Sequence, residues 1–218
     1  MRELTVNTFL TLDGVMQAPG GPEEDPSGGF TLGGWSVNYW DDEMGRIMGE
    51  VMGKPFDLIL GRKTYEIFAA HWPHITDDPA AKALNDATKH VASRTLKSLE
   101  WENSVLIEGD VAEGIAGLKQ QDGPELQVHG SANLIQTLLH HSLIDEFRIW
   151  IFPVVVGSGK RLFADGTAPG GLKLVDSTVS TTGVSIGTYV PAGDIPLGTF
   201  ALEEPTEAEV ERRQRQER

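Results

Sequence analysis

The pattern of apolar and polar positions predicts a chain in which strands alternate with helices. Five short apolar runs are typical of buried strands: residues 4–12, 56–60, 89–92, 104–107 and 125–129. Apolar side chains spaced three and four residues apart predict helices at 41–52, 79–87, 111–119 and 131–142, and a further helix that begins at Tyr65. This alternation favours a layered α/β domain with a mostly parallel sheet.

The stretch 143–163 contains a strand that is apolar on both faces. Phe147, Ile149 and Ile151 fall on one face, and Trp150 and Phe152 fall on the other. Such a strand suits a central position covered by helices on both sides. Two later runs, 172–177 and 184–190, follow without an intervening helix and predict an antiparallel pair at the end of the sheet.

Length and composition narrow the choice of function. The 218 residues are typical of one domain, which we expect to span 1–195, followed by a charged tail at 196–218 that is either a solvated helix or disordered. The 18 basic and 32 acidic residues give a net charge of -14, which argues against nucleic acid or an anionic membrane as the main partner. The absence of cysteine excludes disulfides and cysteine-ligated zinc, so we expect no metal and a cytoplasmic location.

Four predicted strands end in small, hydroxylated or basic residues. The segments are Asp13-Gly14, Gly61-Arg62-Lys63-Thr64, Ser93-Arg94-Thr95 and His129-Gly130-Ser131-Ala132. The second and fourth lead into helices, whose free N–H groups bind anions, and Ser131 is a suitable cap for its helix. Ligands of parallel sheets bind beyond the carboxyl ends of strands, so the four segments together suggest a long, multiply phosphorylated ligand. Ordinary solvated turns are the alternative interpretation.

A long irregular segment, residues 15–34, follows the first strand and is rich in glycine and proline. A loop of this length inside a compact domain is often a functional lid. A disordered surface insertion is the other interpretation.

The chain resembles the dihydrofolate reductase-like superfamily, and within it the stand-alone relatives of the reductase domain of bifunctional riboflavin-biosynthesis enzymes. The matching pieces are TLDGVM, LILGRKTYE, VASRT and HGSANLIQTLLHHSLIDEFRIWIFPVVVGSGKRLF, of which the last is the most specific. The match covers residues 1 to about 190 in the same order. The resemblance implies a three-layer α/β/α fold, NADPH as cofactor and hydride transfer as the reaction.

The same resemblance implies a set of cofactor contacts. Residues near the nicotinamide would be Leu12, Asp13, Gly14 and Val15, with the following loop as the lid. Phosphate contacts would come from Gly61, Arg62, Lys63, Thr64, Gly130, Ser131, Ala132 and Asn133, and contacts near the adenosine 2′-phosphate from Ser93, Arg94 and Thr95. The family usually has two adjacent glycines where this chain has His129-Gly130.

Each residue that the sequence offers for contact with the substrate, or as proton donor, also has a purely structural interpretation. Asp41 and Asp42 lie where classical dihydrofolate reductases place a proton-donating carboxylate, but acids that open a helix also suit its dipole. Trp35 and Tyr39 could stack on a heterocycle or simply pack in the core. A substrate phosphate could contact Lys160 and Arg161, which could equally form an exposed turn. Relatives are commonly homodimers, and the zinc deaminase of bifunctional members is not expected here.

Three functional hypotheses follow. The first is an NADPH-dependent reductase of a small heterocycle, with a ribosylaminopyrimidinone phosphate of riboflavin biosynthesis as the nearest named substrate. The second is a dinucleotide-binding protein of the same fold without turnover. The third is a dihydrofolate reductase proper. The remaining alternative is that the four strand-end turns bind no ligand.

Overall fold

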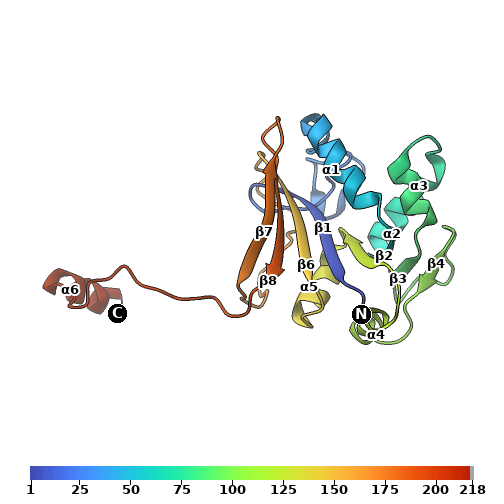
Figure 1. Cartoon of the computed structure of the whole chain (residues 1–218). Helices are drawn as coiled ribbons and strands as arrows, with labels where there is room; N and C mark the ends of the chain where they lie inside the picture. Colours follow the sequence, from blue (N-terminus) through green and yellow to red (C-terminus); the bar gives the residue numbers. More distant parts are fainter. Residues whose placement is uncertain (217–218) are drawn as a thin grey trace.

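The structure is a computed structural model that describes residues 1–216 and contains an eight-stranded sheet between helices (Figure 1). The strands are β1 Leu4–Thr11, β2 Phe56–Gly61, β3 Lys89–Ala92, β4 Ser104–Leu106, β5 Glu125–His129, β6 Glu146–Phe152, β7 Leu172–Val179 and β8 Ser185–Pro191. The helices are α1 Asp42–Met52, α2 Arg62–Ala69, α3 Pro79–Asp86, α4 Val111–Gln120, α5 Ala132–His140 and α6 Glu207–Gln216.

The sheet has the order β4-β3-β2-β5-β1-β6-β8-β7. The six strands from β4 to β6 are parallel, and β8 and β7 join them in antiparallel pairing. The predicted mixed, mostly parallel sheet with antiparallel C-terminal strands is therefore confirmed. The carboxyl ends of β3, β2, β5 and β1 lie side by side at one edge, in that order.

Helices cover both faces of the sheet because the buried strands are apolar on both faces. On one face, Leu58 and Leu60 of β2 pack with Tyr65 of α2 and Leu84 of α3. On the opposite face, the alternate residue Ile59 belongs to the cluster formed by α4 and α5. This arrangement confirms the three-layer architecture.

Helix α1 packs on β6 and β8 through Met44, Ile47 and Met48. Met44 is fully buried and lies in one cluster with Trp150, Phe152 and Ile186. Because Phe147 and Ile149 belong to the cluster on the other face, the two-faced burial predicted for β6 is confirmed. We refer below to the face covered by α1, α2 and α3 as the α1 face.

The start of α2 differs from the prediction. The helix begins at Arg62 and not at Tyr65, with Gly61 as its N-cap. Residues 62–64 are thus the first helical turn, in which backbone N–H groups have no partner within the helix. This local difference strengthens the segment as an anion site.

The irregular segment 15–34 is folded against the body, so a disordered insertion is the wrong interpretation of it. Val15 and Phe30 are buried together. The buried Gln17 donates from Nε2 to the carbonyl oxygens of Asp25 and Ser27, at 2.9 Å each, and accepts from Lys160 N at 3.1 Å. A single amide side chain therefore joins the segment to the loop that follows β6.

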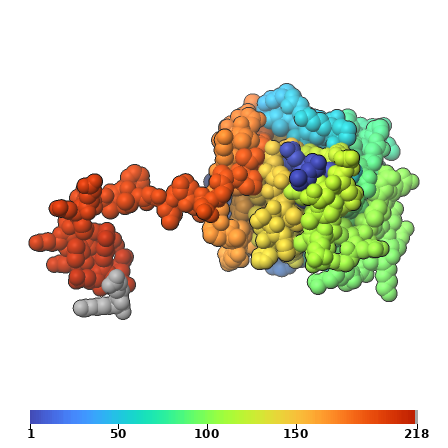
Figure 2. Space-filling model, turned by 60° about the horizontal axis from the view of Figure 1, so that its bottom comes forward, coloured from blue at the N-terminus to red at the C-terminus, as the bar shows by residue number. Residues whose placement is uncertain are grey.

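The chain beyond β8 leaves the body as an extended arm that ends in α6 (Figures 1 and 2). Glu209 pairs with Arg212 and Arg213, as expected of a solvated helix with pairs three and four residues apart. Residues 217 and 218 of the predicted tail lie outside the described residues. Among residues 1–216, no helix has the length and apolar character needed to cross a membrane.

Candidate active site

The four predicted turns meet at one edge of the sheet. Residues 93–95 follow β3, 61–64 follow β2, 130–133 follow β5 and 12–15 follow β1, and these strands are neighbours in the sheet. We call these four segments the strand-end row. The structure therefore brings together side by side all of the segments that were predicted to contact the cofactor.

Ser131 joins the two central turns of the row. Its Oγ accepts a hydrogen bond from Gly61 N at 2.9 Å and donates one to Thr64 Oγ1 at 2.7 Å. Ser131 is the N-cap of α5, as predicted, but its side chain caps nothing in that helix, so the predicted capping bond is wrong. The hydroxyl is used between the turns, and the first N–H groups of α5 keep no side-chain cap.

The backbone angles of this turn show which two positions correspond to the adjacent glycines of the family. Gly130 has φ +84° and Ser131 has φ +69°, whereas His129 is the last residue of β5. The two consecutive positions that favour glycine are thus 130 and 131, and not 129 and 130. Ser131 holds a left-handed conformation that costs a non-glycine residue about 1–2 kcal/mol.

Substitutions at Ser131 separate its hydroxyl from its backbone strain. We expect Ser131→Ala to lower the free energy of unfolding by about 1–2 kcal/mol, because Gly61 N–H loses its acceptor while the strain stays. Ser131→Gly loses the same bonds but relieves the strain, so we expect it to be about 1 kcal/mol less destabilised than the alanine variant. Urea unfolding measures both, and equal stability of the two variants would contradict the assigned strain.

Two of the four turns in the strand-end row carry a basic side chain that is available to bind an anion. Lys63 and Arg94 are exposed, and neither makes a side-chain hydrogen bond or ion pair within residues 1–216. Arg62, in contrast, pairs with Glu66 at 3.1 Å. Lys63 lies in the first turn of α2, so its ammonium adds charge to the free N–H donors there.

The turn after β1 is closed by its own hydrogen bonds. Thr11 Oγ1 accepts from Val15 N at 2.9 Å and donates to Asp13 Oδ1 at 2.6 Å. Asp13 also accepts from Gly157 N at 2.8 Å, and these bonds, that from Thr11 first, hold its pKa below the ordinary value. The Leu12 side chain is 66% exposed and remains free to contact a ligand.

The two cations proposed for a substrate phosphate are occupied by neighbouring groups. Lys160 Nζ pairs with the carboxylate of Asp25 in the irregular segment, and the Arg161 guanidinium binds the carbonyl oxygen of Asp13. Burial alone would raise the pKa of Asp25, but the bond from Lys160 holds it below its ordinary value. Both cations thus hold the segments around the site together.

Most of the remaining predicted residues have structural partners as well. Asp41 caps α1 by accepting from Met44 N at 2.9 Å, and it also accepts from Thr181 N at 2.7 Å. Asp42 lies in the first turn of α1. Trp35 and Tyr39 stand edge-on to Phe152, with ring centroids 5.3 and 6.1 Å away, as in core packing.

Comparison with known proteins identifies the family. Residues 2–186 match the RibD C-terminal domain. The chain belongs to the RibD C-terminal domain family. A relative in the same comparison is the uncharacterized protein YyaP of Bacillus subtilis (strain 168), which is 28% identical over 191 residues, covering 84% of this chain and 92% of that protein.

Solved structures agree with this family. A protein named for riboflavin biosynthesis, from Shewanella sp. PV-4, superposes with a TM-score of 0.60 at 20% identity, over 87% of this chain and 99% of its own. Dihydrofolate reductase from Enterococcus faecalis, solved with NADP(H), gives a TM-score of 0.55 at 13% identity, over 87% of this chain and 96% of its own. These likenesses show that this RibD C-terminal domain has the dihydrofolate reductase-like fold, which is a fold of reductases.

This RibD C-terminal domain also contains a polar network on the α1 face that the sequence analysis missed. Glu125 accepts from Thr5 Oγ1 at 2.5 Å and from Arg148 at 2.8 Å. Its second oxygen accepts from Gln127 Nε2 at 2.7 Å, and Gln127 Oε1 contacts His129 Nε2 at 2.8 Å. The signal in the sequence was the polar alternate residues of β5, which are unusual in a strand covered by helices.

Burial lowers the pKa of His129 to about 4 in the folded domain. The unfolded chain therefore binds a proton at His129 that the folded domain does not, between about pH 6.5 and pH 4. A base with a depressed folded pKa stabilises the fold above its unfolded pKa and loses that contribution as the pH falls. The ring is neutral at pH 7 and acts as one donor and one acceptor.

The acid sensitivity of the fold tests this shift. Between pH 7.5 and pH 5 we expect wild type to lose about 1–2 kcal/mol more unfolding free energy than His129→Gln, after allowance for the partial exposure of the ring. Urea unfolding at the two pH values measures the difference. The exposed His74, replaced by glutamine, serves as the control, and equal pH dependence of wild type and His129→Gln would refute the shift.

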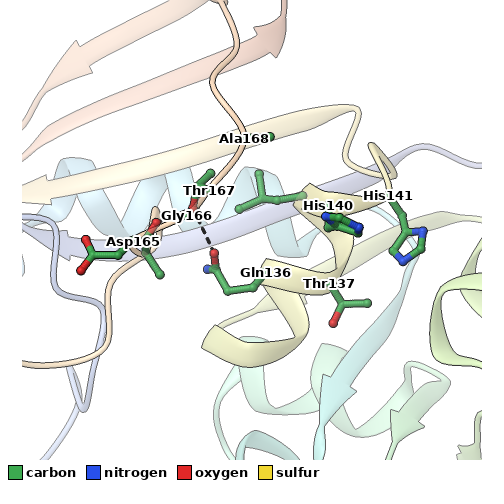
Figure 3. A pocket seen from close by; sticks show the side chains of 10 residues that line it. Gln136, Thr137, His140, His141, Asp165, Gly166, Thr167 and Ala168 are labelled. Carbon is green, nitrogen blue, oxygen red and sulfur yellow. Dashed lines mark hydrogen bonds between the residues drawn. The ribbon is translucent and has the colours of Figure 1, made fainter.

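A hollow of about 390 Å³ lies at the other end of α5, away from the strand-end row. Gln136 and His140 of α5 and the C-cap residue His141 line it together with residues 164–168, and Thr167 Oγ1 lies 3.1 Å from Gln136 Oε1 (Figure 3). Within residues 1–216, no group of three or more histidine, aspartate or glutamate side chains is arranged to hold a metal ion. The hollow contains none of the predicted site residues.

Proposed function

We propose that this protein is an NADPH-dependent reductase that transfers hydride to a small heterocycle. The observation that supports it most strongly is the strand-end row, in which four turns with glycine, hydroxyl and basic residues are neighbours at one sheet edge. Ligands of such sheets bind beyond the carboxyl ends of the strands. Membership of a family with a reductase-type fold agrees with this proposal.

The residues of the row fit a dinucleotide phosphate. The first turns of α2 and α5 offer free N–H groups for a pyrophosphate, and the joined turns at Gly61 and Ser131 hold the two helix ends together. Arg94 is the cation available for a 2′-phosphate. NADPH would supply the hydride, and the exposed Leu12 after β1 would contact its nicotinamide.

The positive charge available near the site limits which substrates it can bind. A ribosylaminopyrimidinone phosphate needs positive charge for its phosphate, but Lys160 and Arg161 are engaged with Asp25 and Asp13. We therefore favour a heterocycle without a phosphate group over the phosphorylated riboflavin precursor.

A second candidate function is dinucleotide binding without turnover. It is favoured by the structural role of Asp41, whose carboxylate caps α1 and binds Thr181. Of the two candidate proton donors, only the exposed Asp42 has no bonded partner among the described residues. Steady-state NADPH oxidation with a panel of pyrimidinones, pteridines and dihydrofolate, compared with NADPH binding, distinguishes the two. Turnover with any of them supports the reductase, and binding without turnover across the panel supports the second candidate.

A further inference from the structure

Asn7 is a buried polar side chain without a partner. It is only 7% exposed, and both its Nδ2 and its Oδ1 are buried without a hydrogen bond among the described residues. Its neighbours Val6 and Thr8 lie in the same strand, β1, and Val6 points into the opposite core cluster. Asn7 therefore faces the α1 side of the sheet. A buried amide with no partner is costly, so such a residue calls for a specific explanation.

His129 lies directly beside Asn7. The two residues are paired in the register of β1 and β5, and Val128 in the opposite core cluster places the His129 side chain on the α1 face too. On the other side of Asn7, the register of β1 and β6 places Arg148. Asn7 is thus the unpartnered member of a polar row that crosses three central strands.

The polar network fixes the tautomer of His129. The carboxylate of Glu125 can only accept, so the Gln127 amide must donate to it from Nε2 and present its Oε1 to the imidazole. The His129 Nε2 therefore carries the proton, and Nδ1 is left as an acceptor. Arg148 and Thr5, which bind Glu125, hold this chain of bonds in place.

Asn7 and His129 lie at a point in the sheet where one strand ends and its neighbour continues. β5 ends at His129, while β1 continues through residues 8–11 beyond the paired Asn7. After β5 the chain enters α5 on one face, whereas the helices that follow β1 and β2 cover the α1 face. Ligands of α/β sheets bind at such switch points. The end of β5 also adjoins Gly130 and Ser131, at the centre of the strand-end row.

We propose that Asn7 and His129 recognise the lactam edge of the heterocyclic substrate, that is, a ring N–H next to a ring carbonyl. The ring N–H would donate to His129 Nδ1, and the carbonyl would accept from Asn7 Nδ2. Asn7 Oδ1 would remain for a second N–H, such as that of an exocyclic amine. The inference deepens the proposed reductase function and rests on it, and it assigns an uncharged hydrogen-bonding edge as the feature that selects the substrate.

A variant pair separates recognition from a structural role. Asn7→Leu removes the unpartnered amide and keeps the number and branching of the side-chain heavy atoms. Ser104→Ala removes another buried oxygen without a partner, on β4 at the far edge of the sheet. We expect both variants to unfold at a temperature no lower than wild type and to bind NADPH as wild type does. Only Asn7→Leu should lose affinity for the lactam compounds, by about 100-fold, because a site built for hydrogen bonds is left unmatched.

The probes are 6-aminouracil with its 1,3-dimethyl counterpart and 7,8-dihydropterin with its N3-methyl counterpart, titrated calorimetrically in the presence of NADPH. We expect the parent compounds to bind wild type and the methylated compounds, which lack every ring N–H next to a ring carbonyl, to bind about 100-fold more weakly. Equal binding of parent and methylated compounds, or no binding of either parent, would overturn the proposal even if Asn7→Leu failed to fold. A marked loss of stability in Asn7→Leu with unchanged affinity would assign the amide to a buried water instead.

The two proposals fail separately. If NADPH binds and other heterocycles are reduced but lactams are not recognised, the recognition pair is wrong and the reductase stands. If NADPH does not bind, the proposed function is wrong, whatever the lactam compounds do.

Discussion

Replacing Gly130 with valine is expected to lower the affinity for NADPH by about 100-fold or more, a loss that corresponds to two charge-assisted hydrogen bonds. Gly130 has φ +84°, and a Cβ built there would point at Thr64, 3.8 Å away across the gap between the two central turns. A branched side chain would therefore occupy the space into which we place the pyrophosphate. Fluorescence titration with NADPH measures the effect.

The same substitution also strains the backbone, so a control must share the strain. Gly109 has φ +71° with nothing within 4 Å of a Cβ, and it lies in the turn before α4. We expect Gly109→Val and Gly130→Val each to lower the unfolding free energy by about 1–3 kcal/mol. Only the Gly130 variant should lose NADPH. Similar affinities in the two variants would show that the pyrophosphate does not lie at this turn.

Replacing Arg94 with alanine is expected to weaken NADPH binding by about 10- to 100-fold and NADH binding by less than about 3-fold. Arg94 follows β3 at the end of the strand-end row and is exposed, with no ion pair within the described part of the chain. The only difference between the two cofactors is the 2′-phosphate, so a selective loss assigns the guanidinium to that group.

Lys97 provides the matched control for Arg94. It is an exposed cation three residues further along the same loop. Lys97→Ala should leave the ratio of the two affinities close to that of wild type, because a change in net charge alone acts weakly at this distance. If Arg94→Ala weakened both cofactors equally, its assignment to the 2′-phosphate would be lost.

Much of the fold could be predicted because local pattern and tertiary packing agree. Alternate burial in β6, with Phe147 and Ile149 on one side and Trp150 and Phe152 on the other, is visible in the sequence and is what the structure contains. The strand ends could be located as well, since glycine and basic residues follow apolar runs at Gly61 and Ala92.

The parts that could not be predicted depend on contacts between distant segments. The hydroxyl of Ser131 suits a helix cap by local rules, but Gly61 N–H, 70 residues away in sequence, binds it instead. Lys160 looks free in the sequence, and only the fold shows that Asp25 occupies it. Asn7 is one of several polar residues in β1, and its lack of a partner becomes visible only when every neighbour is placed.

The most direct test of the account is a titration of the purified protein with NADPH and with NADH, followed by tryptophan fluorescence. Trp40 is 45% exposed and stacks on Trp150, so the protein has a reporter on the α1 side of the sheet. The account predicts saturable binding of both cofactors with a clear preference for NADPH. Absence of binding by either cofactor would contradict the assignment of the strand-end row and, with it, the reductase function.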